Sequence, residues 1–167
     1  MESPISYLYT MAILGMTFIG FSAIVMLLRQ TLGSHLRAFD ARFARVYMEF
    51  GLIVSIGAML PPLLMFWELP PAAVWRVSSS LVGIPLLVFA VTYPARRRAA
   101  SGEPTPRYVR VNLAIVLLIS LTLLIAATGA LRERSGRIFL TALTVFLAFA
   151  VGTWLRALNL ILVPESR

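Results

Sequence analysis

Four polar side chains lie inside stretches of the chain that are otherwise apolar. Glu49 and Asn112 each follow the start of such a stretch, whereas Arg156 and Asn159 lie near the end of another. A charge inside membrane hydrocarbon costs a few kcal/mol or more, so a carboxylate and a guanidinium at the same depth are expected to pair. We predict an ion pair between Glu49 and Arg156, with both asparagines beside it, in a polar vestibule open to the cytoplasm. The alternative is that each side chain reaches the lipid headgroups separately.

Residues that commonly perform catalysis or bind metal are scarce. The sequence has no cysteine and no lysine, His35 is its sole histidine, and Asp40 is its sole aspartate. This composition excludes thiolate sites, a histidine pair for haem or zinc, and a pair of aspartates for intramembrane proteolysis. Neither a nucleophile-elbow motif nor a glycine-rich phosphate loop is present. The sequence therefore predicts a protein that is not an enzyme and that has no metal site and no cofactor.

The elements that must position the polar residues are five long apolar runs. Hydrophobic residues make up 59% of the chain and charged residues 13%, which differs strongly from a soluble globular protein. A helix needs about 20 apolar residues to cross the hydrocarbon core of a membrane. We predict an all-α, polytopic membrane helix bundle with five transmembrane helices in a single domain, residues 1–167. The predicted spans are 5–28, 46–67, 74–93, 108–131 and 138–163.

The arginines are distributed unevenly between the two ends of these spans. Nine flank the first and third connections and four flank the second and fourth. The positive-inside rule then predicts an N-terminus outside and a C-terminus in the cytoplasm. The absence of lysine agrees with a GC-rich bacterial genome, so we expect a bacterial inner membrane.

The formal net charge of +8 could suggest nucleic acid as a partner. We expect anionic lipid headgroups instead, because the arginines lie at span ends, where such headgroups are found. The residues assigned to lipid contact are Arg37, Arg42, Arg45, Arg96, Arg97 and Arg98.

The two longest connections differ in pattern. Residues 34–45 place Leu36, Phe39 and Phe43 at spacings of three and four, which predicts a short amphipathic helix on the inner leaflet. A simple solvated linker is the alternative there. Residues 94–107 are basic and broken by proline, which predicts a flexible loop.

Small residues recur at intervals of about four on two predicted spans, and such faces let helix backbones approach closely. They could pack helices within one protomer or between protomers, or line a pore. These residues are Thr141, Thr144, Ala148 and Gly152 on the fifth span, and Gly51 and Ser55 on the second. In addition, Pro61 and Pro62 in the second span and Pro85 in the third predict helix kinks.

Three functions agree with these features. The favoured one is a homo-oligomeric channel or pore, because the chain is small, has no predicted soluble domain and carries several small-residue faces. The second is a non-transporting scaffold, sensor or accessory subunit that binds lipid or an unknown protein partner. The third is a carrier or receptor for a small apolar ligand held between the second and third spans.

Overall fold

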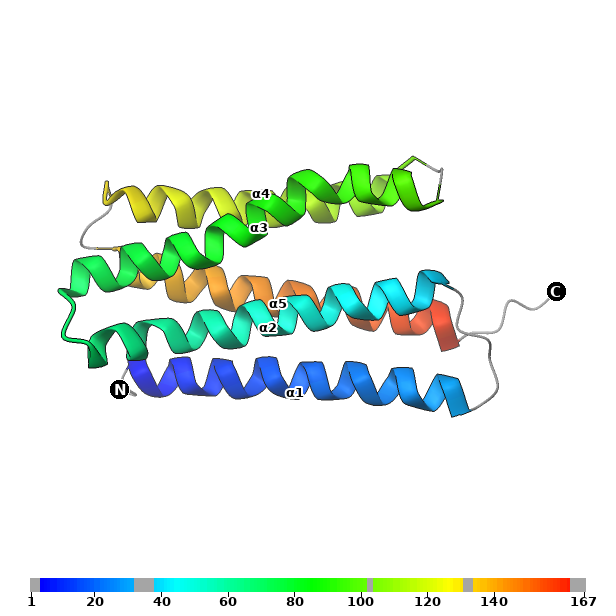
Figure 1. Cartoon of the computed structure of the whole chain (residues 1–167), viewed down its shortest axis with the longest axis horizontal. Helices are drawn as coiled ribbons and strands as arrows, with labels where there is room; N and C mark the ends of the chain where they lie inside the picture. The colour runs from blue at the N-terminus through cyan, green and yellow to red at the C-terminus, as the bar shows by residue number, and fades with distance from the viewer. Residues whose placement is uncertain (1–3, 32–37, 102–103, 131–133, 163–167) are drawn as a thin grey trace. The chain divides into compact units, whose positions relative to one another are not determined.

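The fold is all-α over the residues that the structure, a computed structural model, describes: 4–31, 38–101, 104–130 and 134–162. In these residues there are five helices and no strand, which confirms the predicted fold class (Figure 1). The helices are α1 (Pro4–Thr31), α2 (Ala38–Phe66), α3 (Pro71–Ser101), α4 (Arg107–Thr128) and α5 (Ser135–Leu162).

Each of these helices contains a segment long and apolar enough to cross a membrane. The segments agree with the five runs in the sequence, and the chain is therefore an integral membrane protein. They are Pro4–Leu28, Arg45–Phe66, Pro71–Ala99, Arg107–Thr128 and Ser135–Arg156.

Contacts between residues divide the chain into two compact units. The first contains α1, α2 as far as Met59, and α5 from Leu143 onward. The second contains the end of α2 from Leu60, all of α3 and α4, and α5 as far as Ala142. Two of the predicted polar residues, Glu49 and Arg156, thus belong to the first unit, whereas Asn112 belongs to the second.

Two helices are longer than the sequence predicts. Residues 38–45 are the first turns of α2, continuous with the span, whereas the sequence predicts a separate surface helix over 34–45; residues 34–37 lie outside the described part. Helix α3 continues through Pro94 to Ser101, where the sequence predicts a loop. In both places the residues are mainly alanine and arginine, which favour helix, and a single proline removes only one backbone donor.

The prolines inside the spans do not end their helices. Pro61 is buried and Pro62 half-buried in α2, and Pro85 is exposed in α3, and both helices continue past them. Helix α2 ends instead at a Schellman turn, in which Glu68 has a φ of 55° and the amide of Leu69 donates to the carbonyl of Leu64 at 3.4 Å.

Candidate functional site

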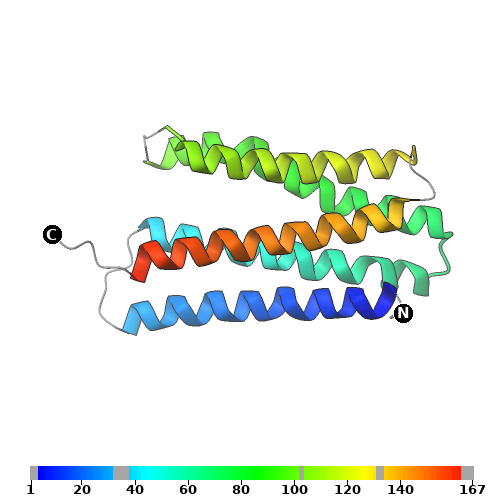
Figure 2. The same ribbon diagram turned by 180° about the vertical axis from the view of Figure 1, so that it is seen from behind.

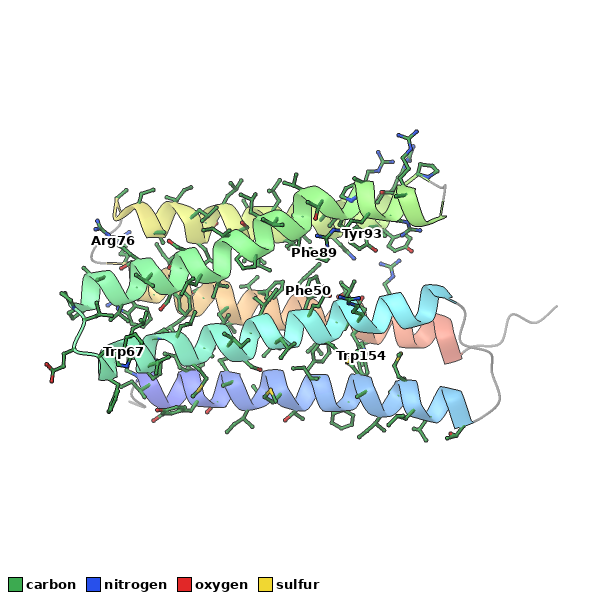
Figure 3. All side chains as sticks on the ribbon, in the orientation of Figure 1. Phe50, Trp67, Arg76, Phe89, Tyr93 and Trp154 are labelled. Carbon is green, nitrogen blue, oxygen red and sulfur yellow. The ribbon has the colours of Figure 1, made fainter. Side chains whose placement is uncertain are left out.

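Aromatic side chains from three helices fill the interior of the first unit. Phe18 of α1 packs edge-on against Tyr47 of α2 and Trp154 of α5, with ring centroids 6.3 and 5.7 Å apart. Phe50 of α2 and Phe146 of α5 pack the same way at 5.0 Å. Figure 3 shows Phe50 and Trp154 among these helices. Each such pair stabilises by about 1 kcal/mol beyond the burial of its area, so this cluster is a main source of packing energy in the unit.

Glu49 lies on the other face of α2. Its carboxylate accepts a hydrogen bond from Nε of Arg45 at 3.0 Å, and the two side chains are 42% and 78% exposed. This corrects the sequence prediction: among the described residues Glu49 pairs with Arg45, one turn earlier, and not with Arg156. The helix period explains the difference, because it places Glu49 among exposed residues. The exposed face holds Arg45, Leu52, Ile56 and Met59, and the buried face Tyr47, Phe50, Val54 and Ala58.

The other members of the predicted vestibule are on α4 and α5. Arg156 is exposed near the end of α5. The side chain of Asn159 lies outside the described residues, and Asn112 is half-buried on α4 in the second unit. The vestibule as a whole therefore stays a prediction, without the ion pair on which it was based.

Helices α1 and α2 cross at small residues. Gly51 and Ser55 of α2 face Gly15 of α1, and the Ser55 hydroxyl donates both to the carbonyl of Ala12 at 3.1 Å and to that of Gly51 at 2.9 Å. A Cβ on Gly15 would meet Ser55 Oγ and would lie 3.0 Å from the carbonyl oxygen of Gly51. The two backbones are thus close enough to exclude a methyl group.

The small-residue face of α5 is divided. Thr144 is half-buried, and its hydroxyl lies 2.6 Å from the hydroxyl of Tyr7 on α1, a hydrogen-bond partner that sequence reasoning missed. Ala148 and Gly152 are exposed, and a Cβ on Gly152 would have no heavy atom outside its own helix turn within 4 Å. Thr141 is also exposed, in the part of α5 that belongs to the second unit.

In the second unit, α3 and α4 lie side by side (Figures 1 and 2). The hydroxyl of Ser120 on α4 donates to the carbonyl of Gly83 on α3 at 2.8 Å, and both residues are buried. A Cβ on Gly83 would lie 3.1 Å from Leu124 Cδ2 and 3.3 Å from Leu123 Cβ. This contact combines a glycine and a serine, as the α1–α2 crossing does. Here, however, the glycine faces leucine side chains, whereas Gly15 faces the backbone of α2.

Two residues near the start of α3 contact the end of α4 and the beginning of α5. Nη2 of Arg76 donates to the carbonyl of Thr128 at 3.4 Å and contacts Gly129, which ends α4 with a φ of 82°. The ring of Trp75 packs on Phe139 at 5.9 Å. A cation at the carboxyl end of a helix offsets the negative end of the helix dipole. A glycine near the end of the predicted span 108–131 was the signal in the sequence for the end of this helix.

Three consecutive serines, residues 78–80, begin two positions after Arg76. Ser80 donates to the carbonyl of Arg76 at 3.0 Å, whereas Ser78 and Ser79 are fully buried and their hydroxyls have no hydrogen-bond partner among the described residues. A rotation of each side chain brings its hydroxyl to the carbonyl one turn earlier, as Ser80 already has it. These hydroxyls therefore need no ligand.

The arginines assigned to lipid contact fall into two groups. Arg45 is engaged by Glu49, and the side chains of Arg37 and Arg42 lie outside the described residues. Arg96, Arg97 and Arg98 lie near the end of α3, the first and third exposed and the second half-buried.

Comparison of the chain with protein-family models, with curated proteins and with solved structures finds no significant match. Fold and composition thus define an integral membrane protein of five apolar helices. In the described residues no group of three or more His, Cys, Asp or Glu side chains is placed to hold a metal ion.

Proposed function

We propose that the protein is a homo-oligomeric channel or pore whose protomers associate through the exposed small-residue face of α5. The observation that carries the proposal is the open position of Ala148 and Gly152 in the second half of an apolar span. Lipid tails give helices no hydrophobic reason to associate, and small residues are what lets two helices come into close contact. The occupant of this face is a second copy of the chain.

A path between protomers suits a chain of this size. A path inside a single five-helix protomer would be cramped, whereas protomers in closed cyclic symmetry surround a central path. Thr141 is exposed on α5, and its hydroxyl oxygen can coordinate a cation or a water molecule in such a path, whereas the hydroxyl of Thr144 is bonded to Tyr7 within the protomer. The proposed protein has no enzymatic activity and resides in a bacterial inner membrane, with its N-terminus outside and its C-terminus in the cytoplasm.

A second candidate is a non-transporting scaffold or accessory subunit. It is favoured because several hydroxyls within the spans are bonded to the backbone of their own helix and do not serve a path for ions. Those of Thr10, Thr17, Thr92 and Thr122 each donate to a carbonyl one turn earlier in the same helix. In such a protein, the α5 face binds a partner's transmembrane helix.

The test compares two exposed glycines. Gly152 of α5 and Gly20 of α1 are both exposed and have open space around the position of a Cβ, so a leucine at either site starts from the same unobstructed position. The mass of the protein in the detergent complex and the ion flux into reconstituted vesicles are measured for the wild type, Gly152→Leu and Gly20→Leu. We expect wild-type oligomers with flux, and for Gly152→Leu single chains of 18.4 kDa with less than about a tenth of the flux.

Gly20→Leu is expected to keep both the oligomer and the flux. A wild-type protein that is a single chain in detergent and in vesicles, or equal behaviour of the two leucine variants, contradicts the proposal. Stable oligomers that conduct nothing favour the scaffold.

A further inference from the structure

The end of α3 and the start of α4 carry a dense group of arginines. Residues 96–98 lie in the last two turns of α3, and Arg107 and Arg110 lie in the first turn of α4. Residues 102–106 alone connect the two helices, so these helix ends are neighbours. Figure 3 shows side-chain nitrogen atoms gathered at this end of α3 and α4, beyond Tyr93.

Four of these arginines, Arg96, Arg98, Arg107 and Arg110, are exposed, and we call them the α3–α4 arginine patch. Between residues 96 and 110 the sequence holds five arginines and a single acid, Glu103, which lies outside the described residues. One carboxylate cannot neutralise this charge. The patch therefore has an excess of positive charge, whatever Glu103 contacts.

The other basic helix ends differ from this patch. At the start of α2, Glu49 offsets the charge of Arg45 within the same helix. At the start of α5, Arg134 and Arg137 are exposed but lie at one helix end. Arg76, in the second unit, is held against the end of α4. Among the described residues of these three helix ends, only the patch brings exposed guanidinium groups together from two helices.

The charges of Arg107 and Arg110 also oppose the field of their own helix. The first turn of α4 contains no acidic residue, and its N-cap, Pro106, provides no side-chain hydrogen bond. A helix N-terminus carries a partial positive charge and favours anions, so two arginines there are unfavourable by themselves. An anion bound between these arginines relieves their mutual repulsion and interacts well with the helix end.

The position of the patch along the membrane spans indicates which kind of anion it binds. The apolar segments of the two helices are Pro71–Ala99 and Arg107–Thr128, so the patch lies where a membrane's hydrocarbon ends and its headgroups begin. Tyr93 and Tyr108 lie at the same ends of α3 and α4, and aromatic residues are typical of this interface. We propose that the α3–α4 arginine patch binds the phosphodiester headgroup of an anionic phospholipid, which guanidinium groups contact in a bidentate manner.

The experiment measures lipid binding to the purified full-length chain. Phosphatidylglycerol or phosphatidylcholine is titrated into the protein in a neutral detergent, and the first bound lipid is quantified by native mass spectrometry. We expect the wild type to bind phosphatidylglycerol at least about tenfold more tightly than phosphatidylcholine. Because each arginine near anionic lipid contributes about fivefold, Arg107→Gln with Arg110→Gln should weaken this binding about 30-fold.

Three further variants sharpen the result. Arg134→Gln with Arg137→Gln removes the same charge at the same spacing from the start of α5, and should change the first binding step less than about threefold. Arg107→Lys with Arg110→Lys keeps the charge and should stay within about fivefold of the wild type. Arg96→Gln with Arg98→Gln should weaken binding about 30-fold from the other helix, and it also provides the test if the α4 variant does not fold.

Several outcomes would overturn the assignment. Equal losses for the α4 and α5 glutamine pairs indicate general attraction to charge rather than a site. Equal binding of the two lipids excludes recognition of an anion. Displacement of phosphatidylglycerol by a short oligonucleotide at equal concentration assigns the patch to nucleic acid.

Discussion

The α1–α2 crossing in the first unit and the α3–α4 contact in the second use the same residue types with different consequences. In each, a serine donates to a carbonyl of the neighbouring helix: Ser55 to Ala12 at 3.1 Å and Ser120 to Gly83 at 2.8 Å. In the first, however, the glycine opposes the backbone of the other helix, whereas Gly83 opposes leucine side chains. Side-chain atoms can move by a few tenths of an ångström, but a helix backbone moves only as a whole.

The largest effect is expected for Gly15→Ala. The new methyl group would lie 3.0 Å from the carbonyl oxygen of Gly51 and 3.2 Å from the amide nitrogen of Ser55, so α1 and α2 must separate. We expect a loss of about 3 kcal/mol in the free energy of unfolding, as for strong overpacking. Loss of helicity during titration of sodium dodecyl sulfate into mixed micelles measures it.

Gly20→Ala is the matched control on the same helix. A Cβ there meets nothing within 4 Å, so the substitution should be neutral or stabilising by up to about 1 kcal/mol through helix propensity. If Gly15→Ala is no more destabilising than Gly20→Ala, the close approach of α1 and α2 is refuted.

A smaller effect is expected for Gly83→Ala. Its methyl group would lie 3.1 to 3.3 Å from atoms of Leu123 and Leu124, most of which can shift within their own side chains. The gain in helix propensity offsets part of this strain, so we expect a loss of at most about 1 kcal/mol in the same titration. A loss as large as that of Gly15→Ala would show that the two contacts do not differ.

The smallest effect is expected for Ser120→Ala. It removes the hydrogen bond to the carbonyl of Gly83, and such bonds between membrane helices contribute about 0.6 kcal/mol on average. The control is Thr122→Val on the same helix, because the hydroxyl of Thr122 donates only to Leu118 in its own helix. In the same titration, Ser120→Ala should lower the free energy of unfolding measurably and Thr122→Val almost not at all. A larger loss for Thr122→Val than for Ser120→Ala would contradict the role of Ser120.

The candidate site shows where one-dimensional reasoning was incomplete. Matching depths suggested a pair between Glu49 and Arg156, but depth is only one of two coordinates of a helical residue. The other is the angle around the axis, which places Glu49 beside Arg45 on an exposed face. The helical spacing of the apolar residues Tyr47, Phe50 and Val54 carried this information in the sequence.

The third connection shows an error of a different kind. Pro94 and the three arginines after it suggested a loop, yet the helix continues to Ser101. The neighbouring alanines and arginines favour helix strongly enough to outweigh one missing donor. This continuation is what holds Arg96 and Arg98 on a helix next to α4.

Composition and run length alone determined that the chain is a membrane protein of five helices, because hydrocarbon demands about 20 apolar residues from every helix that crosses it. The small residues at the α1–α2 crossing could also be named in advance, since close backbone approach requires them. Only the tertiary structure decided which small face is used inside the protomer and which stays open. In lipid almost every residue of a span is apolar, so hydrophobicity no longer distinguishes the inside of the protein from its surface. Side-chain shape and hydrogen bonds between helices select the neighbours instead.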